Sequence, residues 1–345
     1  MDKIFAVILT YNRKDLLRQC LAAVDAQTRR CDGVIVVDNG SSDGTEDMLL
    51  GLDMPGLEVH VLSRNIGASG GFSAGFRIAY QRGADMLWIM DDDVIPEPDA
   101  LDKLLDADRT LAELDQPRAF LLSRAYSETG LLTNVPVVDD RPNRLAYQDW
   151  PRLMEHGLVP VRRGTFVSIL VPRQTVEHYG LPIASMFIWG EDSEFTLRVT
   201  QTSPGYLVAN SKVLHLRQIS GALDIDTEQN PVRLRCHRHL VRNEVFITRQ
   251  FFRRRRVVRI LASQFMVMAR LARRRKFAKA WIVFGGILDS LRFQPKPEPA
   301  DAPVENLGIQ VRVAGRPVVA RPGHEGDEAV AVPGLQLKPG FSAAQ

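Results

Sequence analysis

The strongest constraint on the fold is a short apolar run that ends in three carboxylates. Residues 86–90, Met-Leu-Trp-Ile-Met, lead directly into Asp91, Asp92 and Asp93. An apolar run of this length predicts a strand buried on both faces, as in a parallel sheet covered by helices. The carboxylates then lie at the carboxyl end of the strand, where open α/β sheets bind ligands. Because alternate residues of a strand share a face, Asp91 and Asp93 can converge on one divalent cation, and Mg²⁺ or Mn²⁺ prefers oxygen ligands. The alternative is an acidic helix cap.

The first 90 residues alternate between strand and helix patterns. Short apolar runs predict strands at residues 3–10, 34–37 and 58–63, and apolar residues at helical spacing predict a helix over residues 13–27. This alternation is typical of a doubly wound sheet with helices on both faces. Asp38 directly follows the second strand, where it serves either as a turn-capping residue or as a contact to a ligand.

A glycine-rich segment, residues 64–75, follows the third predicted strand and opens a helix over residues 72–81. Its glycines match neither the Rossmann spacing nor the P-loop spacing. Small residues let the backbone approach a phosphate at a helix N-terminus. They equally allow a helix to pack closely on a sheet, and both interpretations stay open at this point.

Four motifs, in this order, resemble the family 2 glycosyltransferases, which have the GT-A fold and use nucleotide-sugar donors. They are Val-Ile-Leu-Thr-Tyr-Asn-Arg at residues 7–13, Val-Val-Asp-Asn-Gly-Ser-Ser-Asp-Gly-Thr at 36–45, Asn-Ile-Gly at 65–67 and Met-Asp-Asp-Asp at 90–93. The form of residues 65–75 is most similar to the galactofuranosyltransferases and related rhamnosyltransferases. The resemblance is strong over residues 3–93 and weaker to about residue 250.

The resemblance implies roles for the residues of these motifs. It assigns the nucleotide-sugar site to Thr10, Tyr11, Arg13, Asp38, Asn65, Asp91 and Asp92. It also implies a divalent metal, Mn²⁺ or Mg²⁺, held by Asp91, Asp93 and His215 against the donor diphosphate. From the residues alone, a single histidine in an apolar strand such as residues 212–217 is more often structural than a ligand.

A second group of acidic residues lies in the segment 187–198. We expect a helix to begin near Glu191, and acidic residues in a first helical turn stabilise a helix without any catalytic role. The resemblance implies instead that Asp192 is the general base for the acceptor hydroxyl. It further implies that Trp189, Glu191 and Glu194 bind or orient the acceptor. A helix N-terminus lowers the pKa of a carboxylate, which makes a poorer base, and an apolar wall from Trp189 would counter that effect.

Positive charge is concentrated in one segment of the chain. The formal net charge is +3, yet the stretch between Glu244 and Asp289 holds twelve Lys and Arg and no acidic residue, which leaves −9 for the rest. The apolar runs at residues 260–269 and 280–288 are too short to span a bilayer. Basic flanks around short apolar helices predict that residues 249–288 lie on an anionic membrane surface. The alternatives are a solvated helix pair that caps the enzyme and a self-association surface of a homo-oligomer.

The cysteines and the two ends of the chain bear on its location. Cys20, Cys31 and Cys236 are scattered without metal-ligand spacing, which favours a reducing compartment. The first apolar run is too short for a signal peptide. We therefore expect a cytoplasmic protein that is peripheral on the inner face of the cell membrane. Residues 294–345 are rich in Pro, Gly and Ala and are predicted to be mostly disordered.

Together these observations predict an α/β fold with a GT-A-like, mostly parallel but mixed sheet flanked by helices. We expect a catalytic domain at residues 1–232, with its donor half at about 1–95 and its acceptor half at about 96–232. A basic amphipathic helical region at 233–293 and the disordered tail follow it. The resemblance implies metal-dependent, inverting transfer of galactofuranose from UDP-galactofuranose onto a glycan or lipid-linked acceptor in cell-envelope polysaccharide synthesis.

Several other functions stay open. Rhamnosyl transfer from dTDP-rhamnose is the nearest alternative. A nucleic-acid-binding protein and a non-catalytic nucleotide-sugar binder are alternatives of another class. The basic segment has few interleaved aromatic residues and no RNA-binding signature precedes it, so no nucleic-acid partner is expected.

Overall fold

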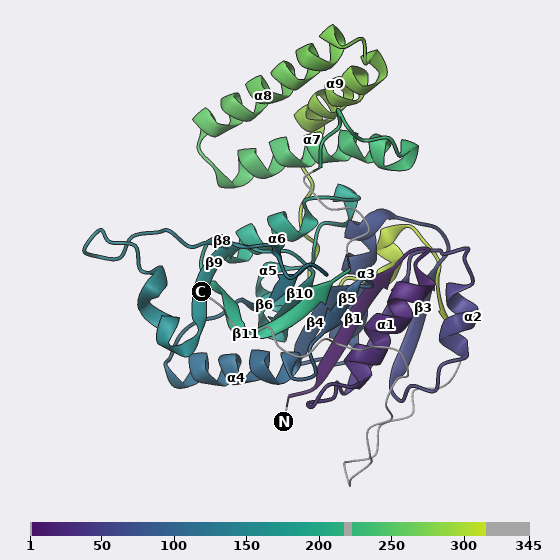
Figure 1. Cartoon of the computed structure of the whole chain (residues 1–345), viewed down its shortest axis with the longest axis vertical. Helices are drawn as coiled ribbons and strands as arrows, with labels where there is room; N and C mark the ends of the chain where they lie inside the picture. Colours follow the sequence, from purple (N-terminus) through teal and green to yellow (C-terminus); the bar gives the residue numbers. More distant parts are fainter. Residues whose placement is uncertain (1, 217–222, 315–345) are drawn as a thin grey trace.

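The computed structural model of the chain describes residues 2–216 and 223–314, whose strands join into one mixed sheet (Figure 1). The strands are β1 (Ile4–Thr10), β2 (Gly33–Asp38), β3 (Leu57–Leu62), β4 (Met86–Asp91), β5 (Val94–Pro96), β6 (Phe120–Tyr126), β7 (Leu132–Thr133), β8 (Val137–Val138), β9 (Leu158–Arg163), β10 (Ser168–Pro172), β11 (Gly205–His215) and β12 (Val311–Ala314). Their order is β12-β3-β2-β1-β4-β10-β6-β11-β9-β8, with β5 paired to β11 and β7 to β6. The predicted α/β fold with a mixed sheet is confirmed.

The half of the sheet that is expected to bind the donor, called the donor half below, is parallel and buried on both faces. Strands β3, β2, β1 and β4 run in the same direction, and helices α1 (Lys14–Asp25), α2 (Thr45–Leu50) and α3 (Gly67–Gln81) connect them. Alternate residues of β1 enter different cores, because Ile8 packs on the side of α1 and Val7 on the side of α3. Burial on both faces explains the near-continuous apolar character of these strands.

The glycine-rich segment packs α3 directly onto β1. A Cβ atom at Gly71 would lie 2.3 Å from Cδ1 of Leu9, and one at Gly75 would lie 2.4 Å from Cγ1 of Val7. These two positions therefore serve close helix-on-sheet packing, one of the two interpretations that the sequence left open.

The half of the sheet that is expected to bind the acceptor adds antiparallel strands. β10 runs antiparallel to both β4 and β6, and the helices of this half are α4 (Ala100–Glu113), α5 (Arg173–Tyr179) and α6 (Glu191–Val199). Residues 135–160 are rich in Pro, Asp and Arg and have few periodic apolar positions, which predicts loops, and this prediction is wrong in part. This stretch contains β8, the 3₁₀ helix η1 (Trp150–His156) and the start of β9. Apolar periodicity did not mark these elements because most of their side chains are exposed at the edge of the sheet.

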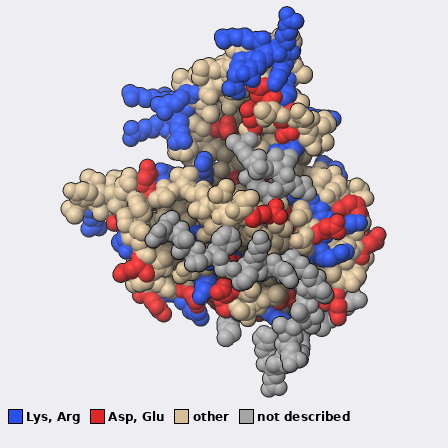
Figure 2. Space-filling model, viewed as in Figure 1, with Lys and Arg blue, Asp and Glu red and all other residues tan. Residues whose placement is uncertain are grey.

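A layer of three helices stands at one end of the molecule (Figure 1). These helices are α7 (Pro231–Phe251), α8 (Arg254–Arg273) and α9 (Phe277–Arg292). The layer has its own small core, to which Val241, Leu271 and Val283 contribute. Figure 2 shows Lys and Arg side chains gathered over the end that α8 and α9 form, whereas both signs of charge are mixed over the sheet. None of the described helices is both long and apolar enough to cross a membrane.

The prediction of disorder is wrong for the described part of the tail. Residues 311–314 form β12, which pairs antiparallel with β3 and extends the sheet by one strand. Ahead of β12, Ala300 and Ala302 are buried, and Glu298 lies 3.0 Å from the buried guanidinium of Arg77 on α3. A Pro-rich composition did not reveal this order because the partners, the edge of β3 and the surface of α3, are distant in sequence. Residues 315–345, to which the same prediction applies, lie outside the described residues.

Candidate active site

The polar residues of the donor half meet at one edge of the sheet. The chain leaves β1 toward β2 on one side and returns through α3 to β4 on the other side, so the strand order reverses at β1. A crevice at the carboxyl ends of the strands is expected where the order reverses. Thr10 at the end of β1 lies opposite Asp38 of β2, and Leu9 lies opposite Asp91 of β4.

Asp38, Asn65 and Tyr11, which are predicted to bind the nucleotide, all lie at this edge. They differ in burial and in hydrogen bonding. The buried carboxylate of Asp38 accepts a hydrogen bond from the Ser41 backbone at 2.9 Å, and burial raises its pKa. Asn65 accepts a hydrogen bond from the Gly67 backbone at 2.7 Å, which shapes the turn into α3. The Tyr11 side chain is 44% exposed, so its ring is accessible to a ligand such as a base.

Two residues that the sequence analysis did not assign hold the loops of this edge. Asn12, whose φ is 53°, accepts a hydrogen bond from the Ser42 backbone at 2.7 Å. The Asn39 side chain accepts from the Ile66 backbone at 3.0 Å and donates to the Gly67 carbonyl at 3.0 Å. Their positions after β1 and β2 were visible in the sequence, but their partners depend on the folded loops.

Asp92 and Arg13 form the inner wall of the edge. Asp92 accepts hydrogen bonds from the Thr10 hydroxyl at 2.7 Å and from Nη1 of Arg13 at 3.1 Å. The same Arg13 nitrogen lies 3.0 Å from Oδ2 of Asp93. Burial raises the pKa of Asp92 to about 6, although Arg13 and Thr10 act against that rise. Asp92 therefore turns toward β1 and is separate from the group of metal-binding candidates.

Asp91, Asp93 and His215 come together as the resemblance implied. One ligand atom from each lies within 4.8 Å of the others, and Nε2 of His215 is 3.2 Å from Oδ1 of Asp93. The pairing of β5 with β11 places His215 opposite Val94, directly after the aspartates. This pairing brings His215, which is distant in sequence, to the end of β4.

The residues present fit a divalent cation. Oδ1 of Asp93 is buried and has no hydrogen-bond partner among the described residues, and it faces His215. Burial, followed by the charges of Asp93 and Asp92, raises the pKa of Asp91 well above its usual range. A bound cation would stabilise the charged form of this carboxylate, which burial and the neighbouring carboxylates disfavour. Two carboxylates and an imidazole form a ligand set suited to Mn²⁺ or Mg²⁺.

Asn134 orients the histidine of this group. Its side-chain oxygen lies 3.0 Å from Nδ1 of His215, so Nδ1 donates and Nε2 is left to face Asp93. Asn134 follows β7 in the left-handed region, with φ of 48°. The sequence analysis missed it because it belongs to the irregular stretch after β7, where no motif or periodicity marks it.

The segment before α6 is strained and docks on the glycine-rich loop. Phe187, Trp189 and Gly190 have φ values of 68°, 61° and 129°. The Phe187 carbonyl accepts a hydrogen bond from the Ser69 backbone at 3.0 Å, and a Cβ at Gly67 would lie 2.1 Å from the same oxygen. Gly67 is therefore required for the close approach of these two segments.

The three acidic residues at the start of α6 have different surroundings. Glu191 is buried and accepts a hydrogen bond from the Ser69 hydroxyl at 3.0 Å, and burial together with the charge of Asp192 raises its pKa to about 8. Asp192 is half-buried, and burial raises its pKa above the usual range despite hydrogen bonds from Ser193. That direction favours a base, so burial outweighs the opposite effect expected from the helix N-terminus.

Glu194, for which the resemblance implies contact with the acceptor, is paired with an arginine of its own helix. Its side chain is buried, and both of its oxygens are engaged by Arg198, at 2.8 and 3.0 Å. Arg198 in turn donates to the Leu181 carbonyl at 3.0 Å. Glu194 therefore holds α6 to the loop after α5 through Arg198. Two residues along the helix from Asp192, it points to another side of α6.

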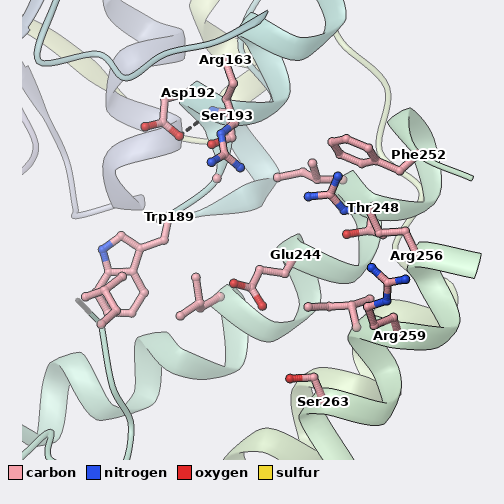
Figure 3. A pocket seen from close by; sticks show the side chains of 15 residues that line it. Arg163, Trp189, Asp192, Ser193, Glu244, Thr248, Phe252, Arg256, Arg259 and Ser263 are labelled. Carbon is pink, nitrogen blue, oxygen red and sulfur yellow. Dashed lines mark hydrogen bonds between the residues drawn. The ribbon is translucent and has the colours of Figure 1, made fainter. Parts of the chain in front are cut away.

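Asp192 and Trp189 line a pocket of about 790 Å³ between α6 and the helical layer (Figure 3). Arg163 at the end of β9 borders the same space, as do Glu244 of α7 and Arg259 of α8. The sequence analysis missed these residues because they come from three elements that only the fold brings together.

Comparison with known proteins agrees with this geometry. Residues 5–141 match the family described as Glycosyl transferase family 2. The galactofuranosyltransferase GlfT1 of Mycolicibacterium smegmatis is 29% identical over 217 residues, which cover 58% of this chain and 66% of that protein. The undecaprenyl-phosphate mannosyltransferase of Micrococcus luteus is 37% identical over 110 residues, or 31% of this chain and 45% of that protein.

The fold is also found in a solved structure. The crystal structure of GalNAc-T7 with UDP, GalNAc and Mn²⁺ superposes with a TM-score of 0.50 at 16% identity, covering 72% of this chain and 48% of that one. The match to GlfT1 spans slightly less than two thirds of that protein's length. The chain carries a glycosyltransferase family 2 domain and resembles the galactofuranosyltransferase branch of that family.

Proposed function

We propose that the chain is a metal-dependent, inverting glycosyltransferase. It would move galactofuranose from UDP-galactofuranose to a hydroxyl group of a glycan or lipid-linked acceptor in cell-envelope polysaccharide synthesis. The observation that carries the proposal is the convergence of Asp91, Asp93 and His215 at the carboxyl edge of the sheet. The candidate base Asp192 lies on a segment that is hydrogen-bonded to the loop opening α3 at the same edge.

In the proposed reaction the chain's own residues bind, orient and move one proton. Thr10, Tyr11, Asp38 and Asn65 hold the nucleotide, and Asp192 takes the proton of the acceptor hydroxyl as its oxygen bonds to the anomeric carbon. The bond from that carbon to the diphosphate breaks on the opposite face, which inverts the configuration. A divalent cation on Asp91, Asp93 and His215 would neutralise charge on the departing diphosphate.

The choice of donor and acceptor rests on the relatives. One matching protein is named a galactofuranosyltransferase, which favours galactofuranose over rhamnose as the transferred sugar. Another is named for transfer involving undecaprenyl phosphate, which favours an acceptor linked to a lipid.

A membrane surface is the proposed partner of the helical layer. Exposed apolar side chains of the helical layer include Met266 of α8 and Phe277 and Trp281 of α9, and the arginines of the layer are concentrated on α8 and in the turn after it. Anionic lipid would attract the arginines, and the apolar side chains would enter the interface. The apolar runs are only partly available for this contact, because Val283 and Ile287 are buried in the core of the layer and Leu261 and Val267 pack against it.

A donor panel tests the proposal. Hydrolysis and transfer should be measured with UDP-galactofuranose and dTDP-rhamnose in the presence of Mn²⁺ or Mg²⁺. We expect turnover with UDP-galactofuranose that is lost in Asp93→Ala, because that change removes a metal ligand. Full turnover in excess EDTA, or turnover with dTDP-rhamnose alone, would contradict the corresponding part of the proposal.

A further inference from the structure

A row of buried hydrogen bonds crosses four neighbouring strands of the sheet, β4, β10, β6 and β11 (Figure 1). The indole Nε1 of Trp88 on β4 donates to the hydroxyl of Ser168 on β10 at 3.0 Å. The Ser168 hydroxyl lies 2.8 Å from that of Ser123 on β6, which lies 2.7 Å from that of Ser211 on β11. The Ser211 hydroxyl donates to the carbonyl of Ala100, the first residue of α4, at 2.8 Å. The row therefore takes one side chain from each strand and ends on a helix.

The two ends of the row fix the direction of every hydroxyl group in it. An indole N–H can only donate and a backbone carbonyl can only accept, so Ser168 donates to Ser123, and Ser123 donates to Ser211. Each hydroxyl then accepts one hydrogen bond and donates one. All three serines are buried, and Ser211 is completely so. Loss of one hydroxyl therefore leaves a neighbouring polar group without its partner in the interior of the protein.

Ser211 belongs to an irregularity in β11. Two consecutive residues of β6 pair with Val208 and Lys212, so β11 has three extra residues, 209–211, at this point. Bulges change the direction of the strand that carries them, and they are frequent beside active sites. The hydroxyl of Ser211 holds this bulge on two sides, since it accepts a hydrogen bond from β6 and donates one to α4.

The bulge decides where the last residues of β11 lie. Beyond it, His215 is paired with Val94 of β5, and the Lys212 carbonyl accepts a hydrogen bond from the Glu97 backbone at 3.0 Å. One residue of a strand spans about 3.3 Å, and a slip by one residue turns each side chain to the opposite face. The contact of 3.2 Å between Nε2 of His215 and Oδ1 of Asp93 would be lost after such a slip. The place of His215 therefore depends on how the bulge is held.

We propose that Ser123 and Ser211 are positioning residues for a divalent cation. They hold the bulge that places His215 beside Asp93. Ser211 lies four residues before His215 along β11, so it acts through the backbone rather than as a ligand. The inference rests on the proposed function, since it takes the carboxyl edge of the sheet to bind the cation. It extends the candidate metal site from the ligands into the interior of the sheet, across β6 and β11.

Calorimetric titration of Mn²⁺ into the full chain, without a donor, tests this inference independently of turnover. We expect Ser211→Ala to weaken Mn²⁺ binding by about tenfold or more, a loss typical of changes to groups that orient a metal ligand. Ser123→Ala should also weaken it, because this change removes the donor to Ser211. At limiting Mn²⁺ both variants should bind UDP weakly. Saturating Mn²⁺ should restore the wild-type affinity for UDP, since the nucleotide-binding residues are unchanged.

The matched control is Ser290→Ala in α9. It removes a serine hydroxyl that is similarly buried and that donates to the Ile287 carbonyl at 2.6 Å. We expect this variant to lower Tm as Ser211→Ala does and to keep the wild-type affinity for Mn²⁺. The pair of variants therefore separates a positioning role from a general loss of stability, because only the positioning role changes Mn²⁺ affinity at a similar Tm.

Wild-type Mn²⁺ affinity in Ser211→Ala, or an equal loss in Ser290→Ala, would overturn the inference and leave the proposed function intact. If Ser211→Ala does not fold, the same comparison of Ser123→Ala with Ser290→Ala decides. A wild-type chain that binds no Mn²⁺ would contradict the inference together with the metal dependence of the proposed function. Weakened Mn²⁺ binding in Ser211→Ala, combined with no turnover of UDP-galactofuranose by the wild type, would support the positioning role and contradict the proposed donor.

Discussion

The side-chain amide of Asn243 donates a hydrogen bond to the carbonyl oxygen of Trp189 at 3.0 Å. The same Nδ2 atom lies 2.9 Å from the Met186 carbonyl and 3.1 Å from the Ile188 carbonyl, and Asn243 is completely buried. Helix α7 thus holds the strained segment that leads into Asp192. The helical layer is, in this respect, a structural part of the candidate active site.

We predict that Asn243→Asp lowers kcat by about tenfold or more while the affinity for UDP stays unchanged. The substitution keeps the shape but presents a carboxylate to three carbonyl oxygens, which leaves buried acceptors unpaired at a cost of about 1–3 kcal/mol each. Separate measurements of kcat, KM and UDP affinity check this. An equal loss of UDP binding and of kcat would indicate general misfolding instead.

The second prediction concerns the orientation of His215. Asn134→Ala removes the oxygen that faces Nδ1 of His215 and should weaken Mn²⁺ affinity by about 10–100-fold. Titration of Mn²⁺ by calorimetry on the free enzyme measures this directly. The control Asn143→Ala changes an exposed asparagine in the same half. An unchanged Mn²⁺ affinity in Asn134→Ala would remove Asn134 from the metal site.

The donor edge was readable from the sequence because its residues end a strand or follow one within a few positions. Asp38 and Asp91 are local in this sense, and the apolar runs before them predicted their position. His215 was identified by resemblance alone, because its approach to Asp93 depends on the pairing of β5 with β11. Asn243 could not be found, since its partners lie more than fifty residues earlier in the chain.

Contacts between residues far apart in the sequence also explain why the order of residues 294–314 was not predicted. Their composition is typical of disorder, but Arg312 forms an ion pair with Glu46, and β12 pairs with the edge of β3. Such pairings depend on an edge that exists only after the donor half has folded. The composition of a segment indicates whether it folds in isolation. It does not indicate whether contact with an already folded part of the chain will order it.

The third prediction uses the raised pKa of Glu191. Because its pKa rises from 4.5 to about 8 on folding, the folded state holds this proton more tightly than the unfolded state does. That contribution to stability is fully present below about pH 4.5 and is lost as the pH rises through 8. Glu191→Gln mimics the protonated acid, so it should match the wild type in Tm at pH 4 and exceed it at pH 9. A difference in Tm that is constant over this range would contradict the raised pKa.

The fourth prediction compares two ion pairs of the C-terminal segment. The guanidinium of Arg77 is 1% exposed, and Glu298→Ala leaves the Pro303 carbonyl as its remaining hydrogen-bond partner within residues 2–216 and 223–314. It should lower the free energy of unfolding by about 1–3 kcal/mol. Arg312→Ala breaks a solvent-exposed pair with Glu46 and should lower the free energy of unfolding less than Glu298→Ala does. Urea denaturation measures both, and a larger loss in Arg312→Ala would contradict this account of the segment.

The most direct test of the central claim is the turnover of Asp192→Asn. The substitution is nearly isosteric and removes the group that would take the acceptor proton, while the donor residues at the ends of β1, β2 and β4 are untouched. We predict that the affinity for the UDP-sugar is retained and that transfer falls by about 10²-fold or more. A variant that transfers sugar at the wild-type rate would contradict the assignment of Asp192 as the base.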